Sequence, residues 1–222
     1  MFLQGIHEGD VLWIDFTGYQ VDQYKSVVSW SSKLSTNGFG ELWQVFSKLW
    51  KNPNDKDFLT FAVHWYIESN ANSGYLEGSI IMAQFALELF YNWLVIDKKK
   101  LLIGKDGENI TASNKIRLLL SIINCKTELP KALSSLQAFV NENKLADGVE
   151  AFVQIRNAII HSQEEKRKKL TDIPYRVKYE AQQLSLYYIE YALLSILKYK
   201  GKYYNRCTGK LQTAEGEENI SY

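Results

Sequence analysis

The chain has 222 residues, enough for one domain with an extension, and its hydrophobic fraction of 46% is sufficient for a substantial core. Its formal net charge is only +1, which excludes a protein-wide basic field, so any nucleic-acid binding must come from local clusters of lysine and arginine. The two cysteines, Cys125 and Cys207, lie far apart without a CxxC spacing, which argues against a disulfide framework or a thiolate metal site and fits a cytoplasmic location.

Residues 1–52 show the least regular pattern, and we treat them as an N-terminal extension of uncertain structure. Within them, residues 11–16 (VLWIDF) predict a short strand, and Gly18, Asn37 and Gly38 mark turns. No cationic segment followed by an apolar one opens the chain, so we expect no secretory signal.

From residue 39 onward, apolar residues recur at helical spacing. The pattern predicts helices over residues 39–51, 55–70, 75–97, 112–124, 130–143, 147–161 and 173–199. Residues 98–107 are charged and contain glycine, which predicts a loop. We therefore predict an all-α fold, with an antiparallel helical bundle over residues 53–200 and a tail over residues 201–222. The polar end of that tail, residues 215–222, is expected to fray.

Two of the predicted helices, over residues 75–97 and 173–199, are hydrophobic on nearly every face. Such a helix lies either in the centre of the bundle or against another subunit, and the sequence leaves both alternatives open. The first of them is interrupted by Glu77, Gln84, Glu88 and Asn92, which a membrane span would tolerate poorly, so we expect no membrane association.

The most informative segment is Arg156-Asn157-Ala158-Ile159-Ile160-His161. It supplies a cation, a carboxamide and a titratable base within about two helical turns. Asn157 and His161 are four residues apart and share a helix face, whereas Arg156 falls among the apolar positions. Asp147-Gly148-Val149-Glu150 predicts a capping box that starts this helix and places His161 near its end.

An arginine, then Asn, Asp or His, then three residues and a histidine resembles the motif of HEPN domains, the higher-eukaryote and prokaryote nucleotide-binding superfamily. The resemblance implies a helical bundle that forms a homodimer in which two copies of the motif face each other. It also implies a metal-independent endoribonuclease without a cofactor, acting on single-stranded RNA in a defence or toxin–antitoxin context.

Metal-independent RNA cleavage needs a base for the ribose 2′-OH, an acid for the leaving 5′-oxygen and positive charge on the phosphorane. In this interpretation His161 transfers protons, Arg156 stabilises the phosphate, and Asn157 orients it or contacts the substrate. The expected products carry a 2′,3′-cyclic phosphate and a 5′-hydroxyl. In the alternative interpretation, His161 is a polar helix-end residue and Arg156 a structural ion-pair partner.

Two further features bear on this site. The cationic run Lys166, Arg167, Lys168 and Lys169 follows the motif and is predicted to bind the RNA backbone, the alternative being a solvated loop. Glu88 interrupts an apolar helix and is predicted to support Arg156 as its carboxylate partner, unless it points to solvent. His7 and His64 lack ligand spacing, so no metal site is expected.

Two other functions remain open at this stage. One is a catalytically silent HEPN module that binds RNA, a nucleotide or a partner protein such as an antitoxin, with Arg156 and His161 satisfied by local contacts. The other is a helical interaction domain in which the motif is accidental and lies far from any cleft.

Overall fold

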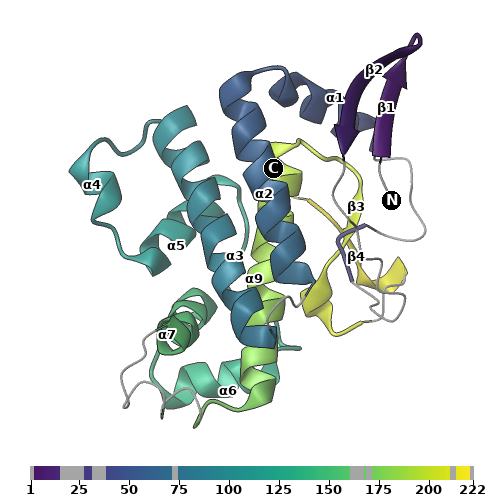
Figure 1. The fold of residues 1–222 in the computed structure, drawn as a ribbon. Helices are drawn as coiled ribbons and strands as arrows, with labels where there is room; N and C mark the ends of the chain where they lie inside the picture. Colours follow the sequence, from purple (N-terminus) through teal and green to yellow (C-terminus); the bar gives the residue numbers. More distant parts are fainter. Residues whose placement is uncertain are drawn as a thin grey trace.

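The computed structural model describes residues 3–15, 28–31, 39–71, 75–160, 168, 172–210 and 214–220. Most of these residues are helical, which confirms the all-α prediction (Figure 1). The helices are α1 (Phe39–Trp50), α2 (Pro53–Asn70), α3 (Tyr75–Tyr91), α4 (Lys105–Glu108), α5 (Ala112–Ile122), α6 (Ser134–Glu142), α7 (Gly148–Ile160) and α9 (Tyr175–Ile196). Their positions follow the apolar periodicity closely, except that α4 lies in a segment predicted to be a loop.

Helix α9 forms the centre of the bundle and packs against α2, α3, α6 and α7 (Figure 1). Every residue from Leu184 to Leu194 is buried. Of the two alternatives that the sequence left open for this helix, the structure shows the core position. Its apolar side chains therefore need no second subunit to cover them.

Helix α3 also belongs to the core, with Ile80, Ala83 and Phe90 completely buried. The stretch Tyr75–Lys98 is long and apolar enough to cross a membrane by length and composition, and half of the window concerned is buried inside the bundle. Beyond α3 the chain continues in wider turns as a π-helix over Asn92–Lys98.

The π-helix, which follows α3 in the chain, contacts the beginning of α2 through side chains. The Trp93 ring stacks on Phe58 with 4.1 Å between centroids, and its indole N–H donates to Asp55 Oδ1 at 3.0 Å. The same carboxylate oxygen lies 2.5 Å from Lys98 Nζ. The buried Asp55 thus has two partners on the π-helix, as a carboxylate removed from water requires.

An N-terminal hairpin consists of β1 (Leu3–His7) and β2 (Asp10–Asp15) in antiparallel pairing. The strand predicted near residues 11–16 is confirmed by β2. Glu8 and Gly9 have φ of 52° and 90°, as a type I′ turn between two strands requires.

The C-terminal segment packs on the bundle. Strand β3 (Lys202–Tyr204) pairs with β4 (Glu217–Asn219), and Tyr203 and Ile220 are buried. The prediction that residues 215–222 fray is therefore wrong for residues 215–220. Strands of three residues are too short for an alternating pattern to reveal them in a polar sequence.

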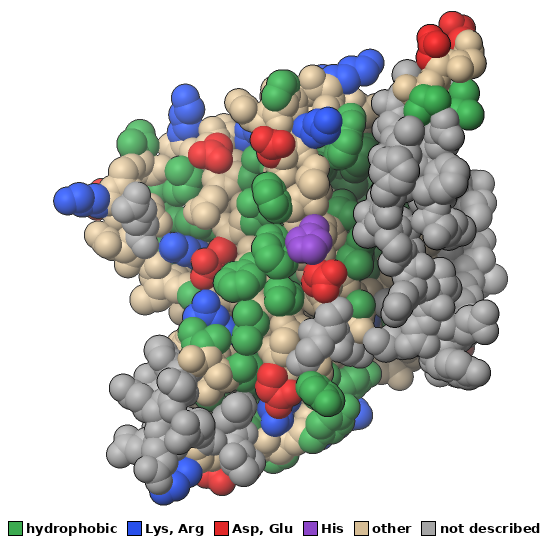
Figure 2. All heavy atoms as spheres, viewed as in Figure 1, with side chains coloured by type: hydrophobic (Ala, Val, Ile, Leu, Met, Phe, Trp, Pro, Cys, Tyr) green, Lys and Arg blue, Asp and Glu red, His purple; other side chains and the backbone are tan. Residues whose placement is uncertain are grey.

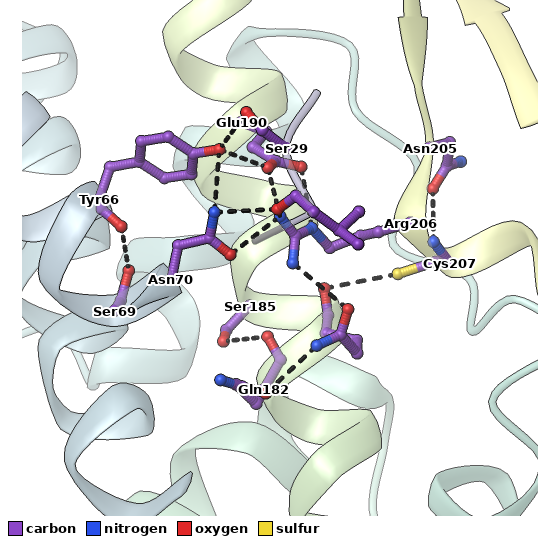
Figure 3. Close-up of polar contacts among 12 residues, drawn as sticks. Ser29, Tyr66, Ser69, Asn70, Gln182, Ser185, Glu190, Asn205, Arg206 and Cys207 are labelled. Atoms are coloured by element: carbon purple, nitrogen blue, oxygen red, sulfur yellow. Dashed lines mark hydrogen bonds and ion pairs between the residues drawn. The ribbon is translucent and has the colours of Figure 1, made fainter. Parts of the chain in front are cut away.

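A buried ion pair fastens this segment to the helices (Figure 3). Arg206 donates from Nη2 to Glu190 Oε1 at 2.5 Å and from Nε to Oε2 at 3.0 Å, and the two side chains are only 2% and 1% exposed. Tyr66 donates to the same carboxylate at 2.7 Å, and Arg206 also donates to Asn70 Oδ1 and to the Val28 carbonyl. This cluster, which we call the Glu190–Arg206 clamp, joins α2, α9, residues 28–31 and the C-terminal segment.

Helix α2 carries apolar side chains on its outer face as well as on its buried face. Phe61, Val63 and Ile67 are 52%, 38% and 54% exposed. Figure 2 shows hydrophobic side chains gathered over α2 and α3 on this face of the molecule. A patch of this kind is typical of interaction surfaces.

Replacing Arg206 with Met should leave the Glu190 carboxylate buried without its cation. We expect the free energy of unfolding in urea to fall by about 3–5 kcal/mol. The double variant Arg206→Met/Glu190→Gln should recover most of this loss, because no buried charge remains. A loss below about 1 kcal/mol for Arg206→Met alone would contradict a central role of the clamp.

Candidate functional site

Helix α7 carries the candidate motif, and reciprocal hydrogen bonds fix its beginning. Asp147 Oδ1 accepts from the backbone N–H of Glu150 at 2.8 Å, and Glu150 Oε2 accepts from the N–H of Ala146 at 2.8 Å. The predicted capping is confirmed, with Glu150 reaching the residue before the cap. Arg117 holds Asp147 with two further bonds of 2.7 and 2.8 Å.

These contacts also set the protonation state of the cap. Burial alone would raise the pKa of Asp147, but hydrogen bonds from Arg117 and from the backbone outweigh this effect and lower that pKa below its ordinary value. Asp147 therefore stays charged at neutral pH and stabilises the N-terminus of α7.

The inner face of α7 packs tightly on the bundle. Phe152 and Ile155 are completely buried, and Gly148 lies so close to the core that an added Cβ would stand 2.6 Å from Leu129 and 2.7 Å from Leu184. The direction of the helix, and with it the direction of each motif side chain, is consequently fixed by packing.

Arg156 is half-buried and has an incomplete set of partners. Its Nη1 donates to Asn157 Oδ1 at 3.1 Å, while its Nε is buried and has no hydrogen-bond partner among the described residues. Arg117, Arg176 and Arg206 each pair with a carboxylate. In the part of the chain that the structure describes, Arg156 has no such partner. A buried donor without an acceptor costs about 1–3 kcal/mol, so the unpaired Nε calls for an explanation.

The predicted pairing of Glu88 with Arg156 is wrong. Glu88 Oε1 instead accepts from Gln84 Nε2 at 2.8 Å, one turn earlier on α3. The amide of a neighbour four residues away satisfies this half-buried carboxylate locally. The positive charge of Arg156 is not neutralised by Glu88.

Of the other predicted site residues, the structure describes only one. Helix α7 ends at Ile160, so His161 follows its last residue and lies outside the described residues, as do Lys166, Arg167 and Lys169. Lys168 is described and exposed. The roles predicted for these five residues stay predictions.

A hollow of about 460 Å³ opens beside the outer face of α7. Its walls include Phe139 and Asn143 at the end of α6, Gln154 and Ala158 of α7, and Asp172 and Ile173. Sequence reasoning missed this feature because three segments distant in the chain form it. Only Gln154, on the polar side of the motif helix, gave a signal that could have been used.

The positions of the other reactive side chains do not indicate a second catalytic site among the described residues. Burial raises the pKa of the Cys125 thiol to about 12, so at neutral pH it stays protonated and is a poor nucleophile. His64 is exposed on α2 beside Trp65. Among the described residues, no three His, Cys, Asp or Glu side chains group as a metal ion would require.

Comparison with known proteins gives a family but no activity. Residues 52–218 match the family model described as the YopA C-terminal domain. The chain is 25% identical over 205 residues to the "SPbeta prophage-derived uncharacterized protein YopA" of Bacillus subtilis (strain 168), a match that covers 92% of this chain and 44% of that protein. The chain thus spans less than half the length of this relative. No solved structure matches it.

A stability measurement distinguishes a ligand-binding arginine from a structural one. Met keeps the aliphatic stem of Arg156 and removes the unpartnered donor, so Arg156→Met should leave the free energy of unfolding unchanged or raise it by up to about 1 kcal/mol. The matched variant Arg117→Met breaks two bonds to Asp147 and should lower it by about 2 kcal/mol. A loss of more than 2 kcal/mol for Arg156→Met would instead identify Arg156 as a structural residue.

Proposed function

The chain belongs to the YopA C-terminal domain family, and we propose that its bundle is a HEPN-like, metal-independent endoribonuclease acting on single-stranded RNA. The observation that carries the proposal is the state of Arg156, a half-buried cation without a carboxylate partner among the described residues, inside an Arg-Asn-x-x-x-His segment. The Bacillus subtilis relative is prophage-derived by name, which fits a defence or toxin role in the cytoplasm.

Arg156 is suited to bind the phosphate of the scissile bond. The hydrogen bond from Nη1 to Asn157 orients the guanidinium before substrate arrives. The guanidinium N–H groups that remain can donate to two oxygens of one phosphate. A preoriented charge in a partly buried site stabilises the developing phosphorane better than a mobile surface charge does. Asn157 thus acts as a positioning residue for Arg156.

His161 supplies the proton transfers in this proposal. One His161 accepts the 2′-OH proton as the 2′-oxygen bonds to phosphorus, and His161 of the partner subunit protonates the 5′-oxygen as its bond to phosphorus breaks. The products are a 2′,3′-cyclic phosphate and a 5′-hydroxyl. A homodimer is required because one chain offers one such histidine, and acid and base must act in the same event.

Residues Lys166, Arg167, Lys168 and Lys169 complete the proposed site. They follow the motif within eight residues and bring cations to the path of an RNA backbone. Phosphate contacts of this kind position a nucleic acid without reading its sequence.

The alternative is a catalytically silent HEPN-like module that binds RNA, a nucleotide or a partner protein such as an antitoxin. The contact between Arg156 and Asn157 favours it, since it satisfies part of the guanidinium locally. The apolar outer face of α2 offers a surface for a protein partner. RNA binding by a wild type that shows no cleavage activity would support this alternative.

Catalysis is tested with three variants and a chelator in single-turnover cleavage of single-stranded RNA. His161→Ala should abolish cleavage with little change in melting temperature, and Arg156→Ala should reduce turnover by about 100- to 1,000-fold with a smaller effect on affinity. The exposed His64→Ala serves as the matched control and should cleave normally. Inhibition by EDTA, or normal cleavage by His161→Ala, would contradict the proposal.

The dimer is tested with two exposed isoleucines on different helices. Ile160 is 42% exposed at the end of α7, where two motifs would meet, and Ile67 is 54% exposed on α2. We expect a dimer by light scattering at micromolar protein, which Ile160→Glu dissociates because a charge would enter the interface. Ile67→Glu should stay dimeric. The reverse result would place the interface on α2 and leave the two motifs apart.

A further inference from the structure

The hollow beside α7 has the chemistry of a site for a planar, hydrogen-bonding ligand. Phe139 contributes a half-buried ring, and Asn143 and Gln154 contribute amides. Glu142 and Asp172 add two exposed carboxylates, and no lysine or arginine lines the hollow among the described residues. This composition disfavours a phosphate and favours a heteroaromatic base.

Helix geometry relates the hollow to the proposed cleavage site. Gln154, Asn157 and Ala158 stand at positions i, i+3 and i+4 of α7, so they share one side of the helix. Gln154 and Ala158 line the hollow. A base bound there would therefore lie on the same side of α7 as Asn157 of the motif.

The balance of donors and acceptors selects among the bases. The Asn143 amide nitrogen donates one of its two N–H groups to the Phe139 carbonyl at 2.9 Å, which leaves the other N–H as a donor and the oxygen as an acceptor. Glu142 and Asp172 can only accept when ionised. Gln154 has no hydrogen-bond partner among the described residues and keeps an amide N–H to donate. The two carboxylates and two amide oxygens give the pocket more acceptors than its two amide NH2 groups give donors, and this balance matches the guanine edge, which offers adjacent N1–H and N2–H donors beside the O6 acceptor.

We propose that this hollow, which we call the base pocket (Phe139, Glu142, Asn143, Gln154, Asp172), binds one guanine base of the RNA. The placement of that guanine next to the cleaved phosphate rests on the proposed ribonuclease function, whereas guanine binding itself does not. In the bound state Phe139 stacks on the base, Gln154 donates to O6, and the carboxylates accept from N1–H and N2–H.

The first experiment measures binding without turnover. Calorimetry with the full chain carrying His161→Ala should show 3′-GMP binding at least about tenfold more tightly than 3′-AMP, 3′-CMP or 3′-UMP. Adding Gln154→Leu or Asp172→Asn should remove most of this preference. Gln137→Leu, an exposed amide of α6 outside the hollow, is the matched control and should leave the preference unchanged. Equal affinity for the four nucleotides, or an unchanged preference in both pocket variants, would overturn the proposal.

The second experiment separates the pocket from the ribonuclease. Cleavage sites in a random single-stranded RNA should cluster beside guanosine for the wild type and for Gln137→Leu, and lose this preference in Gln154→Leu. If the wild type does not cleave but the guanine preference in binding depends on Gln154, the proposed function fails and the base pocket stands. If the wild type cleaves without regard to guanosine and binds the four nucleotides equally, the pocket fails and the ribonuclease stands.

Discussion

The buried ion pair between Glu190 and Arg206 is the constraint on which the rest of the structure depends. A carboxylate in the middle of the central helix is tolerated only when a cation reaches it. That cation comes from the C-terminal segment, after a short strand, and its remaining donors extend to α2 and to the main chain of Val28. One requirement for charge neutralisation therefore adds directional contacts among four parts of the chain, several of which also meet in the apolar core.

A second arginine, Arg156 on α7, is in the opposite situation to Arg206. Arg206 has every part of its charge balanced, whereas Arg156 keeps a buried N–H without an acceptor among the described residues. A rigid scaffold makes this difference possible, because α7 is held by its cap, by Gly148 and by its buried inner face. The stability of the bundle thus offsets the cost of a polar group left ready for a ligand.

Much of the fold can be predicted from the sequence because most of its helices are long. Helices such as α7 and α9 repeat their apolar pattern over several turns, so their limits are predicted to within a few residues. The C-terminal strands escape prediction because three residues carry no period. The sequence offers Glu88 both a distant arginine and Gln84, four residues away on the same helix, and only the structure shows that Gln84 is its partner. The base pocket depends on how α6, α7 and residues 172–174 meet, which no local pattern encodes.

The π-helix after α3 has a consequence for the history of the chain. Wider turns of this kind take up one more residue than an α-helix does over the same rise, so they are the natural result of a single-residue insertion into an existing helix. Without that residue, the end of the π-helix would be rotated by about 100° around the axis, and Lys98 would turn away from Asp55. Relatives that lack the insertion should therefore also lack the lysine–aspartate pair, and the two features are expected to be gained or lost together.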